Sequence, residues 1–144
     1  FSNLTDESLS KKVHEKVRTA GRLAWHITTS IPEMMNRAGL KIESVKEDSL
    51  IPATVSELVN AYKNVSEALI TQVKANRNDE TLMKEDDMYG EMCMKGKTLG
   101  ILITHQIHHR SQLTVVMRLL GLKVPGIYGP SNEEWTAYGM PAQE

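Results

Sequence analysis

Apolar residues recur every three or four positions in three long segments of the chain, which is the spacing of one helix face. The first helix is predicted over residues 17–38, with an apolar stripe formed by Leu23, Ile27, Ile31, Met34 and Ala38. Pro32 either kinks this helix or restarts it, because Ser30 and Glu33 have the spacing of a capping box. Gly39 is expected to mark its C-terminal end.

A second helix is predicted to begin after Thr54, which has capping-box spacing to Glu57, and to end near Asn76. Its buried stripe is expected to consist of Leu58, Tyr62, Val65, Leu69 and Val73. Residues 40–53 carry mixed charges and a proline, so we expect a long connector between the first two helices.

The last long helix is predicted over residues 98–120, with a stop at Gly121. It contains THQIHHRSQL, residues 104–113, in which three histidines lie within five positions. Three such helices predict an all-α fold. The histidines raise the question of whether they bind a metal or pack in the core.

Positions around this helix place two of the histidines together. When each residue advances by about 100° from His105, His109 falls at about 40°, and Leu102 and Leu113 at about 60° and 80°. Both histidines therefore lie within the apolar stripe, whereas His108 falls at its margin. Two imidazoles one turn apart can reach one ion. From this pair alone, a metal site and two hydrogen-bonded core histidines are equally good interpretations.

A third ligand would have to come from another helix, and His26 in LAWHITTSIP is the candidate. Its position at the edge of the first helix's apolar stripe favours a site near the mouth of a bundle, with an open coordination position. The alternative is a rim histidine hydrogen-bonded to water. His14 lies in the charged segment KKVHEKV and is expected to be solvated.

Residues 77–96 are expected to form a loop or a short hairpin. Their acidic run at positions 85–87 is expected to be solvated, because the calcium-loop pattern is absent. The methionines at 83, 88, 92 and 94 are expected to pack rather than to bind copper. GEMCMKGKT, residues 90–98, is similar to a phosphate-binding loop but has five residues between its glycines where that motif needs four.

Length, charge and cysteine content limit the classes of protein. The 144 residues fit a single domain, and a net charge of −1 disfavours binding to nucleic acid or to an anionic membrane. No stretch approaches the roughly 18 apolar residues of a membrane-spanning helix. Cys93 is the only cysteine and is expected to be a half-buried structural thiol. We expect a cytoplasmic protein.

The combination of LAWHITTSIP, HQIHHRSQLTVVMRLLGL and VPGIYGPSNEEW resembles the DinB-like family of bacterial four-helix-bundle proteins, also called DinB/YfiT-like. The resemblance covers nearly all of residues 1–144. It implies an all-α DinB-like four-helix bundle whose first helix would precede Phe1 and would be truncated here. Residues 4–9 would then form a turn before the second bundle helix. The segment SNEEWTAYG would be a short C-terminal piece, capped by Ser131 and Glu134, with Trp135 packed on the bundle.

The resemblance implies that His26, His105 and His109 together bind one divalent metal ion, nickel or zinc. His108 occupies the neighbouring position that does not bind the metal. The family usually has glycine at the position of Ser111, but this residue is expected to face outward and to leave the ligand set intact. Thr28, Thr29, Arg110 and Gln112 are candidates for supporting or substrate-binding groups, against the interpretation that they are ordinary helix residues.

Relatives in the family include transferases and isomerases that use low-molecular-weight thiols such as bacillithiol, mycothiol or glutathione. The resemblance therefore implies a thiol-dependent S-transferase in which the metal activates a thiol for attack on a small electrophile. A metal-dependent hydrolase and a noncatalytic, stress-related metal-binding protein remain alternatives. The resemblance and the outward residues Ile103 and Ile107 also predict a homodimer, or cover by another helix.

Overall fold

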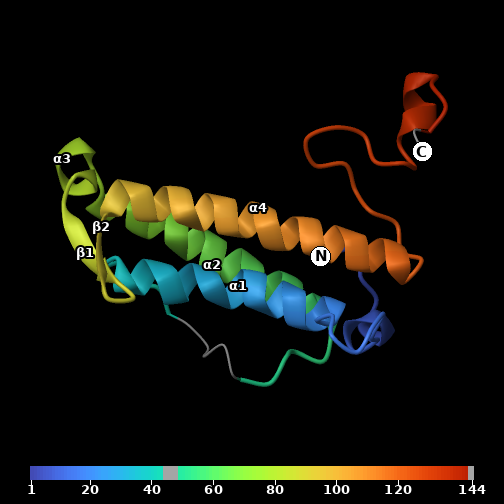
Figure 1. Cartoon of the computed structure of the whole chain (residues 1–144), viewed down its shortest axis with the longest axis horizontal. Coiled ribbons are helices and arrows are strands. Elements are labelled where there is room, and N and C mark those ends of the chain that lie inside the picture. Colours follow the sequence, from blue (N-terminus) through green and yellow to red (C-terminus); the bar gives the residue numbers. More distant parts are fainter. Residues whose placement is uncertain (44–48, 143–144) are drawn as a thin grey trace.

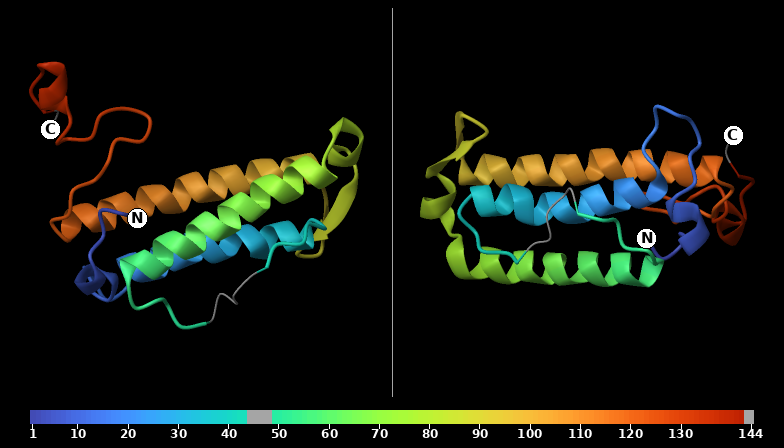
Figure 2. Two further views of the ribbon diagram at one scale, coloured as in Figure 1. Left: turned by 180° about the vertical axis from the view of Figure 1, so that it is seen from behind. Right: turned by 90° about the horizontal axis from the view of Figure 1, so that it is seen from below.

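The computed structural model describes residues 1–43 and 49–142, in which three long helices lie side by side (Figure 1). They are α1 (Ala20–Arg37), α2 (Val55–Asn76) and α4 (Lys95–Leu119). α1 and α2 run in the same direction, and α4 runs antiparallel to both (Figure 2). The shorter elements are η1 (Asp6–Leu9), α3 (Asp79–Leu82), β1 (Glu85–Met88), β2 (Glu91–Met94) and η2 (Trp135–Tyr138).

The all-α prediction is correct for the long elements. Of the two alternatives predicted for residues 77–96, the short hairpin is observed, formed by β1 and β2. The fourth α-helix among the described residues, α3, has four residues and is not a bundle helix. These residues therefore form a bundle of three long helices. The expectation that another helix precedes Phe1 stays a prediction.

α1 is continuous through Pro32, so of the two predicted alternatives the restart is wrong. Its first turn is capped by the Thr19 hydroxyl, which accepts the backbone N–H of Arg22. The capping box at Ser30 does not form, because the Ser30 hydroxyl donates to the carbonyl of Ile27. All five positions of the predicted apolar stripe are buried.

The other two long helices also match their predicted segments. α2 has the predicted reciprocal capping box between Thr54 and Glu57. α4 begins at Lys95, earlier than predicted, and ends just before Gly121, whose φ of 74° is left-handed. The carbonyl of Met117 accepts the N–H of Leu122 across this turn.

The core surrounds α1, whose residues belong to both large hydrophobic clusters. In one cluster, Leu23 and Ile27 of α1 pack with Leu58 of α2 and Leu113 of α4. η1 lies against the first turn of α1, where a Cβ on Gly21 would come within 2.7 Å of the Leu9 carbonyl oxygen. Because buried side chains of α1 pack tightly in both clusters, α1 is held in a fixed position relative to α4.

The hairpin closes the bundle at the C-terminal end of α1. Met88 and Cys93 are buried and pack with Ala38. Cys93 is therefore more deeply buried than predicted, because strand alternation turns it inward. The other three methionines of this region, Met83, Met92 and Met94, are exposed, so their predicted packing is wrong.

The acidic run at the hairpin is only partly solvated. Asp86 forms an ion pair with Lys95 at the start of α4, so it has a structural partner. Glu85 and Asp87 are exposed, and the Asp87 carboxylate accepts the N–H of Gly90 in the turn. The prediction of a solvated face is correct for these two residues and wrong for Asp86.

The C-terminal segment leaves the bundle after α4, and η2 projects beyond the long helices (Figures 1 and 2). An ion pair between Arg118 and Glu133 ties it to α4. Trp135 is not among the residues packed against the two large clusters of the described chain, so its predicted packing on the bundle is wrong. η2 has no side-chain cap, although Glu134 accepts the N–H of Ser131.

Residues 40–43 and 49–53 contain no helix or strand, as predicted for the connector. Residues 44–48 of that predicted connector lie outside the described residues. Within the part of the chain that the structure describes, no helix has both the length and the apolar character needed to cross a membrane.

Candidate metal centre

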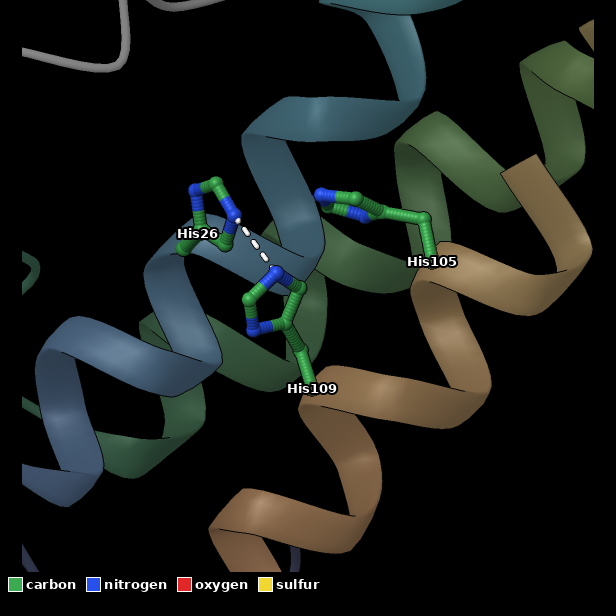
Figure 3. Close-up of side chains that lie close together, drawn as sticks. All are labelled: His26, His105 and His109. Atoms are coloured by element: carbon green, nitrogen blue, oxygen red, sulfur yellow. Dashed lines mark hydrogen bonds between the residues drawn. The ribbon is translucent and has the colours of Figure 1, made fainter. Parts of the chain in front are cut away.

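The fold brings His26 of α1 together with His105 and His109 of α4 (Figure 3). The three ring centroids lie 4.4 to 5.1 Å apart. Each residue offers a ring nitrogen, and these three nitrogens all lie within 4.8 Å of one another. The predicted ligands, separated by up to 83 positions in sequence, therefore form one cluster.

The spacing of these nitrogens fits a shared ion. The Nε2 atoms of His26 and His109 lie 3.1 Å apart and point toward each other (Figure 3). Two imidazole nitrogens at the usual distances of about 2.0 to 2.1 Å from one metal ion would be separated by about 3.0 to 3.4 Å. The third nitrogen, on His105, lies within the 4.8 Å limit of the cluster, so a small side-chain movement brings it to the same point.

Gln112 sets the orientation of His109. Its Oε1 lies 2.8 Å from Nδ1 of His109, and because an amide oxygen only accepts, Nδ1 donates this hydrogen bond. The Nε2 lone pair of His109 is thereby left free to face His26. The Gln112 amide nitrogen donates to Nε2 of His108 at 3.0 Å, which holds Gln112 in place from the other side. Such outer partners are common for metal-binding histidines.

The environment favours the neutral form of His109, which is the form that binds metals. Burial is the largest cause and lowers its pKa from the usual 6.5. The nearby groups of His26, His108 and Arg18 lower this pKa further, against the opposing effect of the hydrogen bond to Gln112.

A buried glutamine fixes the two helices that carry the ligands. Gln106 of α4 donates through Nε2 to the Ile27 carbonyl at 2.8 Å and lies 3.2 Å from the Ser30 hydroxyl. Gln106 directly follows His105 in α4, and its partner Ile27 directly follows His26 in α1. This contact therefore joins the two helices next to the histidines. Sequence reasoning missed this residue, although it falls about 100° from His105 on the helix, inside the half that faces the core.

Other candidate residues are placed away from the cluster. Thr28 and Thr29 are buried, and their hydroxyls donate to carbonyls one turn earlier in α1. Arg110 lies in the groove between α2 and α4. Ser111 is exposed, as predicted, and His14 is exposed in the segment before α1. Of the four candidate supporting residues, Gln112 contacts a predicted ligand, His109.

A cavity of about 680 Å³ opens directly beside the cluster, between α4 and the start of α1. His109 and Gln112 form part of its wall. His109 can therefore be reached from the surface through this cavity.

Comparisons with known proteins identify the family of the chain. The model of the DinB family matches residues 1–144. The chain is 38% identical over 142 residues to the uncharacterized protein YrdA of Bacillus subtilis (strain 168), covering 99% of this chain and 85% of YrdA. It is also similar to the crystal structure of a DinB-like protein from Bacillus cereus ATCC 10987, with a TM-score of 0.83 and 38% identity, over 88% of this chain and 85% of that one.

Proposed function

Because the chain belongs to the DinB family, we propose that His26, His105 and His109 bind one nickel or zinc ion and that the protein is a thiol-dependent S-transferase. The observation that supports the metal site is the convergence of three imidazole nitrogens within 4.8 Å. Nickel and zinc both suit imidazole ligands. The transferase activity rests on the family resemblance, together with the chemistry described below.

Three protein ligands leave at least one coordination position for a reactant, as in catalytic rather than structural sites. A divalent ion in this position would act as a Lewis acid and lower the pKa of a thiol that reaches it. Gln112 keeps the donor nitrogen of His109 pointing inward, and Gln106 keeps α1 and α4 in register. The buried residues around α1 shield one side of the site from water.

The reaction is a substitution at the electrophile. The thiol loses its proton to solvent, its sulfur forms a bond to the electrophilic carbon, and the bond from that carbon to the leaving group breaks with both electrons going to the leaving group. This requires a nucleophile supplied by the substrate. Cys93 cannot serve as the nucleophile, because it is a buried residue of β2 that packs against Ala38, next to the C-terminal end of α1.

The cavity beside His109 favours this reaction over metal-dependent hydrolysis. A hydrolase using the same ligands needs a general base near the attacking water. None of the residues that line the cavity in the described part of the chain is a carboxylate. A thiol with a lowered pKa needs no such base at neutral pH.

A panel of thiols, each incubated with metal-loaded protein and monochlorobimane, tests the proposal. A transferase gives fluorescent conjugate at a rate that depends on both the metal and the thiol. Unchanged rates after removal of the metal would contradict the transferase. Tight metal binding without any turnover would instead favour a noncatalytic metal-binding protein.

We propose further that the protein is a cytoplasmic homodimer. Its single thiol, Cys93, suits a reducing compartment. Ile103 and Ile107 lie on the outer side of α4 and are 60% and 38% exposed, which supports their cover by a second chain or by another helix.

A further inference from the structure

The cavity beside the histidine cluster differs in character on its two sides. Its apolar wall contains Leu23 of α1 and Val115 and Leu119 of α4, which can contact the carbon skeleton of a ligand. Its other side is formed by the segment that leads into α1. Lys16 and Arg18 of this segment line the cavity together with His109 of α4.

The ionisable side chains around the cavity have one sign. Lys16 and Arg18 are positively charged, the remaining ionisable wall residues are His108 and His109, and no carboxylate lines the cavity among the described residues. Within residues 1–43 and 49–142, neither Lys16 nor Arg18 forms a salt bridge. Both side chains are exposed, so they can reach a ligand in the cavity.

The start of α1 adds to the positive potential. Arg18 directly precedes Thr19, the N-cap of an 18-residue helix. The N-terminal end of a helix carries a partial positive charge that favours anions. The chain as a whole has a net charge of −1, so this positive region is local rather than general.

We propose that this cavity binds the carboxylate groups of the thiol substrate through Lys16 and Arg18, so that the protein uses an anionic, carboxylate-bearing thiol. The identity of the ligand as a thiol rests on the proposed function. The cavity volume of about 680 Å³ is within the usual range for small-molecule sites and exceeds the needs of a simple thiol. A dicarboxylate fits the two cations, and the apolar wall contacts its carbon chain.

Isothermal titration of zinc-loaded full chain with succinate tests the carboxylate site without any thiol chemistry. Succinate should bind to the wild type, and a Lys16→Gln, Arg18→Gln double variant should bind it at least about tenfold more weakly. The affinity of the wild type should also fall with added salt, because both cations are exposed. A Lys74→Gln variant changes an exposed cation at the distant end of α2 and should bind succinate like the wild type.

Equal succinate affinity in the wild type and the double variant would overturn the proposal, as would no binding to either. A loss of the same size in Lys74→Gln would also overturn it, because the effect would then come from net charge alone. The zinc content of every variant is measured in parallel. Retention of zinc by the double variant is expected, since neither residue belongs to the histidine cluster.

A second comparison separates this proposal from the proposed function. Mercaptosuccinate and neutral 1-thioglycerol are each tested for conjugation to monochlorobimane. The wild type should prefer mercaptosuccinate over thioglycerol, and the double variant should lose most of this preference. Conjugation of both thiols with no preference would contradict the carboxylate site. Absence of conjugation with either thiol, when succinate still binds in the Lys16- and Arg18-dependent way, would contradict the transferase and support the site.

Discussion

Oε1 of Gln112 lies 2.8 Å from Nδ1 of His109, on the opposite side of the imidazole from the nitrogen that faces His26. This contact holds the ring in the orientation and tautomer that a metal requires. We expect Gln112→Ala to weaken metal binding by about 10- to 100-fold, measured by competition with a chelator of known affinity.

The matched variant is Gln112→Glu, whose carboxylate can accept the same hydrogen bond from His109. It should restore most of the metal affinity lost in Gln112→Ala. If Ala and Glu at this position gave the same affinity as glutamine, the contact would have no role in holding the ligand.

Loss of a ligand should abolish conjugation while the fold survives. The His26 side chain is only partly buried, so His26→Ala removes a proposed metal ligand without opening a large cavity. We expect no metal-dependent thiol conjugation by this variant and a far-ultraviolet circular dichroism spectrum like that of the wild type.

Cys93→Ser is the companion test for the nucleophile. The variant should conjugate at nearly the wild-type rate, with a modest loss of stability because it places a hydroxyl in the buried hairpin cluster. Conjugation that disappeared with Cys93 but persisted in His26→Ala and after chelation would show a cysteine-based mechanism instead.

The stability of the metal-free protein should depend on pH through His109. Burial lowers its pKa below 6.5, so as the pH falls through this value the unfolded chain takes up the proton before the folded chain does. The free energy of unfolding should therefore be fully retained above pH 6.5 and decrease below it. His109→Asn should show a shallower decrease in urea unfolding between pH 8 and pH 5.5.

His14→Asn is the control for this pH dependence, because His14 is exposed in the segment before α1. The slope of His109→Asn is compared with the slope of this variant. An identical slope in His109→Asn and the wild type would show that the burial of His109 does not couple to folding.

The outer face of α4 should mediate self-association. Ile103 and Ile107 lie one turn apart and are exposed. In sedimentation velocity, we expect a dimer at micromolar concentration that Ile103→Lys converts to monomer, since a buried lysine would have no partner across the interface. Monomer in the wild type over the same range would rule out the dimer.

The helices could be predicted from sequence because their signals are local. The apolar stripe of α1 and the capping box at Thr54 depend on residues within one or two turns of each other, and both were correct. The hairpin was predicted only as an alternative to a loop. In the hairpin, Met88 and Cys93 are buried against Ala38 of the segment after α1. This packing depends on tertiary contacts, which a local sequence pattern does not reveal.

The cluster of three histidines could be predicted because each of the two helices shows its own part of the pattern. The spacing of His105 and His109 is a local pattern, and His26 is a candidate because of its position at the edge of the first helix's apolar stripe. The family resemblance implies that the three act together. The contact of Gln106 with α1 and the place of Lys16 and Arg18 in the cavity wall could not be predicted, because both depend on how α1 packs against α4.

The metal content of protein purified without a polyhistidine tag tests the central claim most directly. Elemental mass spectrometry should find about one nickel or zinc ion per chain in the wild type and very little in a His105→Ala, His109→Ala double variant. His108→Ala should keep nearly all of its metal, because His108 contacts Gln112 rather than the cluster's centre. Full metal retention by the double variant would contradict the assignment of the site.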